Sequence, residues 1–254
     1  MGGMRQFGVD EKFGKGYFAV PEPGDGPGVI VLHAWWGLTA FFRKVCDRLA
    51  QEGFAALAPD LYHGATASTI EEAKRLRFDL DCDRANREMK AALEYLRNHP
   101  VISGTSVGVV GFSLGGYLAL RLARSKANDV RAVVVFYATE GGRFNKAQAA
   151  FLGHFAENDG CWAGARVVRS LEERLRAAGR ETIFHTYPGT EHSFFEEDRP
   201  EAYNAQAALL AWQRTVEFLR TRLTRPRVAY ATLWGHSVPT AQIPTHLRSV
   251  DAEG

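Results

Sequence analysis

Short apolar runs alternate with longer amphipathic segments along the 254-residue chain. Strands of a parallel sheet are covered by helices on both faces, so they are nearly continuously apolar. Four runs of this kind are predicted to be buried strands: 28–35, 55–62, 107–113 and 131–138. Three more mixed runs are further candidates: 150–159, 181–189 and an antiparallel edge strand at 16–22.

The segments between these runs have helical periodicity and recognisable ends. Thr39 is a predicted N-cap, and Gly53 is predicted to end the same helix at the C′ position. Ser68 and Glu71 have the spacing of a capping box. A last amphipathic helix is predicted over 204–223. Because parallel neighbours need a crossover connection, this alternation predicts an α/β fold with a mostly parallel, doubly wound sheet flanked by helices.

Residues 1–224 are expected to form a single domain, and residues 225–254 a C-terminal extension. The extension contains Pro226, Pro239 and Pro244 and has no clear period. An irregular segment is therefore the expected structure, and an arm that binds a partner or another copy of the chain is the alternative.

Composition excludes several classes of protein. Hydrophobic residues make up 46% of the chain, charged residues 24%, and the formal net charge is only +2, so nucleic acid is not an expected partner. Cys46, Cys82 and Cys161 have no paired spacing, which argues against a disulfide framework and a zinc site. We find neither a signal-peptide pattern nor an apolar stretch long enough to span a membrane, so the expected location is the cytoplasm.

Residues 111–115 read Gly-Phe-Ser-Leu-Gly, at the junction of a predicted strand and a helix. The G-x-S-x-G pattern is typical of the nucleophile elbow of α/β-hydrolase folds, in which a sharp turn lifts a serine above the sheet. Such a turn brings its flanking positions so close together that only glycine avoids a clash. The pattern predicts that Ser113 is a nucleophile, and a plain tight turn is the alternative.

A serine hydroxyl needs a base, and the base needs an acid that orients it. In α/β-hydrolase folds the order along the chain is Ser, acid, His. Asp159 ends one candidate strand and His192 follows the next, so all three side chains are expected at one edge of the sheet. Glu157 is the nearest rival for the acid. His154 and His185 are rivals for the base, but both lie inside predicted strands, which favours a structural role.

Acyl-transfer chemistry also needs N–H donors for the developing oxyanion. The residue after the nucleophile, Leu114, is one predicted backbone donor, and Trp35 in the loop after an early strand is the other. Trp36, Tyr137 and Phe194 are predicted from their positions to form a small apolar pocket. Packing in the core is the alternative for the tryptophans. We find no metal-ligand cluster and no phosphate-binding glycine loop, so neither a metal nor an organic cofactor is expected.

Five segments in this order resemble the dienelactone hydrolases: "VIVLHAWWGL", "GFAALAPDLYHG", "GVVGFSLGG", "FAENDGCW" and "YPGTEHSFF". The resemblance extends roughly from residue 16 to residue 222. It implies a compact α/β-hydrolase fold without a large lid, and hydrolysis of cyclic enol-lactones and small carboxylic esters. It also implies that Ser113 is the nucleophile, Asp159 the acid and His192 the base. The backbone N–H groups of Trp35 and Leu114 are implied to be the oxyanion donors.

Three positions depart from the best-known members of that family. Ser113 stands where they have Cys, and Ala34 stands where they have a Glu that helps to activate the thiol. The two changes fit together, because a serine activated by His192 needs no thiolate. Glu196 stands where the family has an Arg that holds a substrate carboxylate. This exchange argues against a preference for anionic lactones.

The sequence therefore predicts a serine hydrolase that cleaves small carboxylic esters or lactones through an acyl-enzyme. Its expected partner is the small-molecule substrate, without nucleic acid or membrane, and its expected state is a monomer or a small homo-oligomer. One alternative is a peptidase or acyltransferase on the same scaffold, for which an added alcohol or amine would accept the acyl group faster than water. The other is a non-catalytic hydrolase-fold binding protein, which the intact order of Ser, Asp and His argues against.

Overall fold

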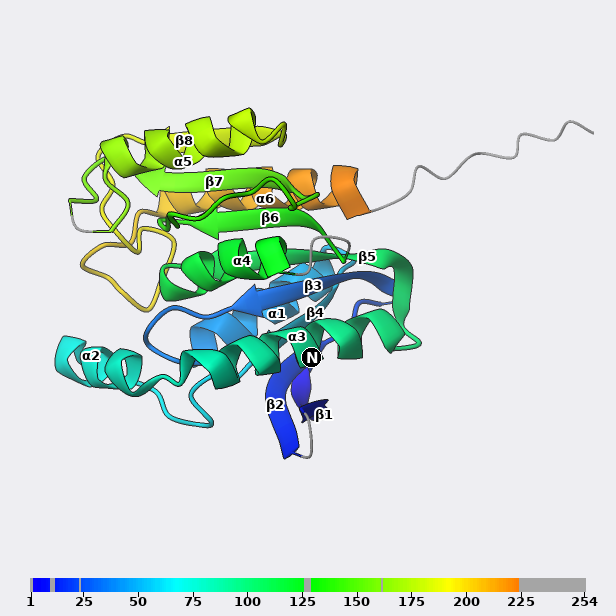
Figure 1. The fold of residues 1–254 in the computed structure, drawn as a ribbon. Coiled ribbons are helices and arrows are strands. Elements are labelled where there is room, and N and C mark those ends of the chain that lie inside the picture. The colour runs from blue at the N-terminus through cyan, green and yellow to red at the C-terminus, as the bar shows by residue number, and fades with distance from the viewer. Residues whose placement is uncertain (1, 10–11, 23, 126–128, 161, 224–254) are drawn as a thin grey trace, which may run out of the picture.

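The computed structural model describes residues 2–9, 12–22, 24–125, 129–160 and 162–223 (Figure 1). The predicted extension at 225–254 lies outside the described residues. Within them, the strands form one eight-stranded sheet in the order β1-β2-β4-β3-β5-β6-β7-β8. The bounds are β1 Gly3–Val9, β2 Lys12–Ala19, β3 Gly26–Leu32, β4 Ala55–Pro59, β5 Ile102–Phe112, β6 Val130–Phe136, β7 Ala150–Ala156 and β8 Thr182–Tyr187.

The sheet is mostly parallel, as the alternation of strands and helices predicted. Strands β4, β3, β5, β6, β7 and β8 run parallel to their neighbours, whereas β1 pairs with β2, and β2 with β4, in antiparallel fashion. The expected antiparallel edge strand at 16–22 corresponds to residues 16–19 of β2. It is antiparallel as predicted, but the edge position was wrong, because β1 pairs with β2 on its outer side. Strand β1 was not predicted, because most of its side chains face solvent and it contains no apolar run.

Helices cover both faces of the sheet. Helices α1 (Ala40–Gln51) and α6 (Ala205–Leu223) pack on one face, and α3 (Cys82–Asn98), α4 (Leu114–Ser125) and α5 (Ala165–Ala177) on the other. Alternate residues of β3 enter the two cores: Val29 and Val31 join the first, and Ile30 and Leu32 the second. Because both faces of the central strands are buried, these strands contain no polar alternation, and this is the pattern that made them recognisable in the sequence.

Helix α2 (Ile70–Asp79) lies beyond the edge at which the parallel strands end, at the left of Figure 1. Its capping box is one residue later than predicted, because it is formed by Thr69 and Glu72 rather than by Ser68 and Glu71. The Glu72 carboxylate accepts hydrogen bonds from the backbone N–H groups of both Ser68 and Thr69. Two neighbouring hydroxyl residues precede two neighbouring glutamates, so the spacing alone allows both registers.

The predicted ends of α1 are confirmed in position. Thr39 is its N-cap residue, although the Thr39 hydroxyl donates to the Asp198 carboxylate at 3.4 Å rather than to the helix. Gly53 follows the C-cap with a φ of +93°, a conformation that glycine adopts without strain.

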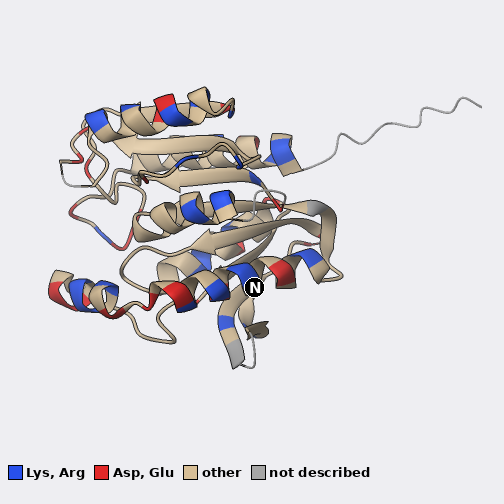
Figure 2. Cartoon of the chain, viewed as in Figure 1, with Lys and Arg blue, Asp and Glu red and all other residues tan. Residues whose placement is uncertain are grey.

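Charged residues of both signs lie mainly on the outer helices, and the central strands are almost free of them (Figure 2). Among the described residues, no helix combines the length and the apolar character that crossing a membrane would require. No separate lid domain is inserted into the part of the chain that the structure describes.

Candidate active site

Ser113 occupies a one-residue turn between β5 and α4. It has a φ of +50°, which is unusual for a residue with a side chain and is found where the surrounding structure imposes it. The Ser113 N–H donates to the carbonyl of Phe136 at 3.0 Å, which fixes the turn to the end of β6. A Cβ on Gly111 would lie 2.3 Å from the carbonyl oxygen of Gly115, and one on Gly115 would lie 2.1 Å from that of Leu32. The turn therefore requires both glycines.

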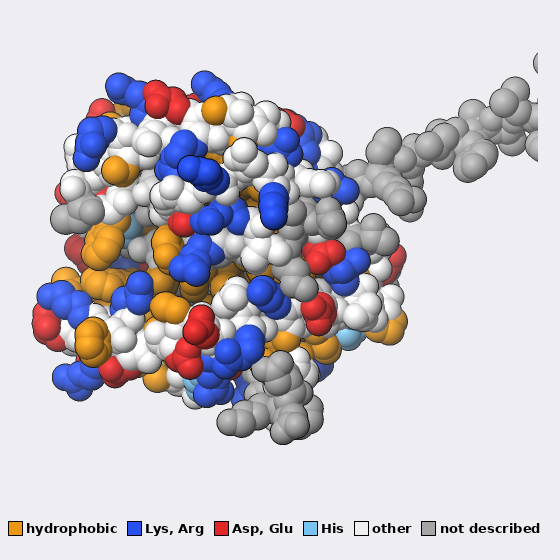
Figure 3. Space-filling model, viewed as in Figure 1, with side chains coloured by type: hydrophobic (Ala, Val, Ile, Leu, Met, Phe, Trp, Pro, Cys, Tyr) orange, Lys and Arg blue, Asp and Glu red, His pale blue; other side chains and the backbone are white. Residues whose placement is uncertain are grey.

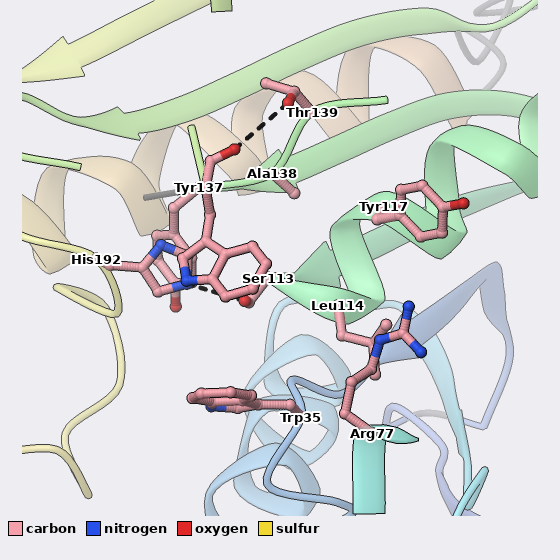
Figure 4. Close-up of a pocket in the computed structure, with 10 residues that line it drawn as sticks. Trp35, Arg77, Ser113, Leu114, Tyr117, Tyr137, Ala138, Thr139 and His192 are labelled. Atoms are coloured by element: carbon pink, nitrogen blue, oxygen red, sulfur yellow. Dashed lines mark hydrogen bonds between the residues drawn. The ribbon is translucent and has the colours of Figure 1, made fainter. Parts of the chain in front are cut away.

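The imidazole of His192 lies between Ser113 and Asp159. Its Nε2 is 2.8 Å from the Ser113 Oγ (Figure 4). Its Nδ1 is 2.7 Å from Oδ2 of Asp159. Asp159 is 3% exposed, and its Oδ1 accepts a hydrogen bond from the Trp162 N–H at 3.1 Å. An ionised carboxylate can only accept, so Nδ1 carries the proton and Nε2 is free to accept the proton of the serine hydroxyl.

Burial would by itself raise the pKa of Asp159. The hydrogen bond and charge of His192, together with the N–H groups of Trp162 and Ala163, outweigh burial and hold this pKa below its usual value. The carboxylate consequently stays ionised while it orients the imidazole.

The rival acid and bases occupy other positions. Glu157 is exposed, and its Oε2 accepts from the Gly189 N–H at 2.8 Å. His154 is fully buried in β7, where its ring nitrogens are 2.8 Å from the Tyr187 hydroxyl and 3.0 Å from that of Thr215. This is the satisfied core histidine that its place in a strand indicated.

A tight turn follows β3, closed by a hydrogen bond of 3.2 Å from the Gly37 N–H to the Ala34 carbonyl. The buried His33 braces this turn. Its Nε2 accepts from the Leu61 N–H at 3.3 Å, so its Nδ1 carries the proton and donates to the Ala34 carbonyl at 2.7 Å. Burial lowers the pKa of His33, which keeps the ring neutral. Trp35 lies in the middle of this turn.

A pocket of about 320 Å³ opens beside Ser113 and His192. In Figure 3 hydrophobic side chains gather near α2 and α4, around the edge at which the strands end. The indole rings of Trp35 and Trp162 lie edge to face, with centroids 6.3 Å apart and 66° between the ring planes. The residues that line the pocket are Trp35, Arg77, Ser113, Leu114, Tyr117, Tyr137, Ala138, Thr139, Trp162 and His192.

Two of the predicted pocket residues are not among these. Trp36 is 6% exposed and packs beneath the turn, with the Arg199 guanidinium 3.7 Å from its ring centroid. Phe194 is fully buried and packs on Tyr137 and Tyr187. The prediction was wrong for both, because adjacent residues of a tight turn point to different sides and a loop aromatic can turn toward the core.

Five lining residues were not predicted: Arg77, Tyr117, Ala138, Thr139 and Trp162. Tyr117 lies one helical turn after Ser113, and the i, i+4 spacing is a signal that could have identified it. Trp162 follows Asp159 by three residues. Arg77 comes from α2, and nothing in its local sequence points toward the pocket. Finding Arg77 required the tertiary structure.

Glu196 does not line the pocket. It is fully buried, and its Oε1 accepts a hydrogen bond of 2.6 Å from the Tyr137 hydroxyl. Burial raises the pKa of Glu196 to about 7, against the opposing effects of the Tyr137 hydrogen bond and of His192. The sequence argument against anionic substrates assumed that Glu196 replaces a pocket arginine. That argument fails, because Arg77 supplies a cation to the pocket from a different element.

The elbow and the sheet order define an α/β-hydrolase fold. A dienelactone hydrolase-like promiscuous phosphotriesterase from metagenomic libraries has this fold, with a TM-score of 0.77, 23% identity and coverage of 88% of this chain and 99% of that one.

Sequence comparison identifies the family. Residues 15–223 match the Dienelactone hydrolase family. Protein usf of Aquifex pyrophilus is 34% identical over 233 residues, which are 88% of this chain and all of that protein. A candidate carboxymethylenebutenolidase of Aquifex aeolicus is 31% identical over 234 residues, with the same coverage. The chain belongs to the dienelactone hydrolase family and is a carboxylic ester hydrolase.

The raised pKa of Glu196 predicts that this residue makes the free energy of unfolding depend on pH, and that Glu196→Gln removes this contribution. Between the ordinary value of 4.5 and about 7, the unfolded chain has released the Glu196 proton and the folded chain has not. As pH rises through this window, the free energy of unfolding of the wild type therefore falls relative to that of the variant, by about 3 kcal/mol in total. Outside the window, the difference between the two proteins does not change with pH. Urea unfolding of both proteins from pH 4 to 8 measures this. Parallel stability curves would contradict the prediction.

Proposed function

We propose that Ser113 is the nucleophile of this hydrolase, His192 its general base and Asp159 the acid that orients the base. The observation that carries the proposal is the unbroken chain of two hydrogen bonds, 2.7 and 2.8 Å long, from Asp159 through His192 to Ser113. The Ser113 Oγ attacks the carbonyl carbon of the substrate while Nε2 removes its proton. The imidazolium that forms is stabilised by the Asp159 carboxylate.

The collapse of the tetrahedral intermediate completes acylation. The C–O bond to the leaving group breaks, and His192 gives its proton to the departing alkoxide oxygen. Water then attacks the acyl-enzyme, with His192 again taking a proton, and Ser113 leaves with that proton restored. With a lactone, acyl and alcohol parts remain one molecule, and the product is a hydroxy acid or its tautomer.

We assign the stabilisation of the oxyanion to two backbone N–H groups, those of Trp35 and Leu114. Leu114 is the first residue of α4, and the N–H groups of a first helical turn have no acceptor within their helix. Trp35 lies in the turn that His33 braces, and both residues line the pocket next to Ser113. Donors of this kind are held in place before the reaction, and each contributes about 10²- to 10³-fold to the rate.

The pocket supports small substrates with a negative group. Its volume of about 320 Å³ is at the low end for ligand sites, and Trp35 and Trp162 form its walls. Arg77 is the cation among its lining residues and can hold a carboxylate by paired hydrogen bonds. The name of the Aquifex aeolicus relative denotes a butenolide lactone with a carboxyl group. We infer that lactones and small esters bearing a carboxylate are preferred.

A fluorophosphonate probe tests the assignment of the nucleophile. The expected result is a covalent adduct at Ser113, because the phosphorus centre accepts the activated hydroxyl as a carbonyl does. Labelling disappears in Ser113→Ala and is strongly reduced in His192→Ala, as measured by peptide mass spectrometry. An adduct on another residue, or none on the folded wild type, would contradict the proposal.

Arg77→Gln tests the preference for a carboxylate. We expect kcat/KM for p-nitrophenyl hemisuccinate to fall about tenfold or more, because one charge-assisted interaction is lost, and kcat/KM for p-nitrophenyl butyrate to change less than about twofold. Arg75→Gln is the matched control, since Arg75 is an exposed arginine on the same helix. Equal losses on both esters, or the same selective loss in the Arg75 variant, would argue against this role for Arg77.

A further inference from the structure

The side of His192 that faces the protein core rests on Tyr137. The two ring centroids are 4.8 Å apart, with 56° between the ring planes. Tyr137 is fully buried, and its φ is +41°, a strained conformation for a bulky residue. Strain of this kind persists where the surrounding structure enforces it and is concentrated at functional sites. Here it follows the end of β6, where the Tyr137 N–H donates to the His154 carbonyl at 2.7 Å.

The phenol of Tyr137 is hydrogen-bonded to a second buried carboxyl group, that of Glu196. Its hydroxyl donates to Oε1 of Glu196 at 2.6 Å, and Oε2 of Glu196 is buried with no hydrogen-bond partner among the described residues. The ionisable groups that act on this carboxyl are Tyr137, His192 and Asp198, and the Ser193 hydroxyl also lies near it. A buried carboxylate without a cationic partner is unfavourable, so its presence behind the imidazole needs an explanation.

We propose that Glu196 is a positioning residue for the general base: its carboxyl group fixes Tyr137 against the His192 ring and, when ionised, places a second negative charge behind the imidazolium. The inference rests on the role proposed above for His192. Asp159 holds the imidazole through Nδ1, and Glu196 acts from the core through the phenol. The charge favours the transition state, in which His192 is protonated, over the resting state, in which it is neutral.

This charge is present only over part of the pH range. Burial raises the pKa of Glu196 to about 7, so the group is neutral in acid and becomes ionised as pH rises through neutrality. Below this range the neutral carboxyl still supports Tyr137 but adds no charge. Above it the imidazolium gains the second counter-charge. The contribution of Glu196 to the rate therefore increases with pH, whereas a purely structural contribution would be the same at all pH values.

The test is the ratio of kcat/KM between the wild type and Glu196→Gln, measured from pH 5.5 to 9 with a neutral p-nitrophenyl ester. Glutamine keeps the shape and an acceptor for Tyr137 but cannot ionise. We expect a ratio of about five to ten above pH 8 that falls toward one below pH 6. The loss is expected in kcat with KM nearly unchanged, because Glu196 does not line the pocket. In Glu157→Gln, the exposed matched control, the ratio stays near one throughout.

Tyr137→Phe provides a second measurement that keeps the aromatic ring. Without the hydroxyl, the buried carboxyl loses its donor and favours the neutral form, so the same loss is expected above pH 8. Adding Glu196→Gln to this variant should then change little. A ratio that does not vary with pH, or full additivity of the two changes, overturns the inference. If Ser113 still takes the fluorophosphonate label, the proposed function survives that outcome, whereas absence of the label in the wild type refutes the proposed function itself.

Discussion

The imidazole of His192 joins two groups that are 79 and 33 residues away from it in the chain, and the proposed chemistry depends on both hydrogen bonds. If the bond to Asp159 were absent, the ring could take the wrong tautomer and present a donor to the serine. If the bond to Ser113 were absent, the hydroxyl would keep its proton and remain a weak nucleophile. The rest of the structure can be understood as the support for this one ring.

Each of the three side chains leaves the sheet at the end of a parallel strand. Ser113 follows β5, Asp159 follows β7 and His192 follows β8, so their loops meet at the carboxyl edge. Ser113 has a positive φ in the elbow. Gly111 and Gly115 allow β5, α4 and β3 to approach so closely that a side chain at either glycine would clash with the backbone. Strain is placed at the proposed nucleophile, and the buried parallel strands on both sides compensate for it.

Much of this arrangement could be predicted from the sequence, because it is recorded in local patterns. Continuous apolar runs identified the parallel strands, and Gly-x-Ser-x-Gly identified the turn at Ser113. The position of each polar residue after a strand indicated which acid and which histidine would meet. The edge strand β1 escaped prediction because its solvent-facing side chains give no apolar signal.

The pocket was harder to predict, because its lining depends on the direction in which a side chain points. Trp35 and Trp36 are adjacent in the chain, yet one lines the cavity and the other packs under Arg199. Arg77 reaches the site from α2, far along the chain from Ser113, and Glu196 turns into the core. The direction of these side chains cannot be predicted from the periodicity of the sequence, because it depends on how loops and helices pack.

The most direct test of the central claim compares Asp159→Asn with Glu157→Gln in steady-state ester hydrolysis. Both changes replace a carboxylate by its amide in the same loop, but only Asp159 contacts the imidazole. The hydrogen-bond chain predicts that Asp159→Asn lowers kcat by about 10³- to 10⁴-fold and that Glu157→Gln lowers it less than about twofold. The reverse ranking, or two equally small effects, would contradict the account.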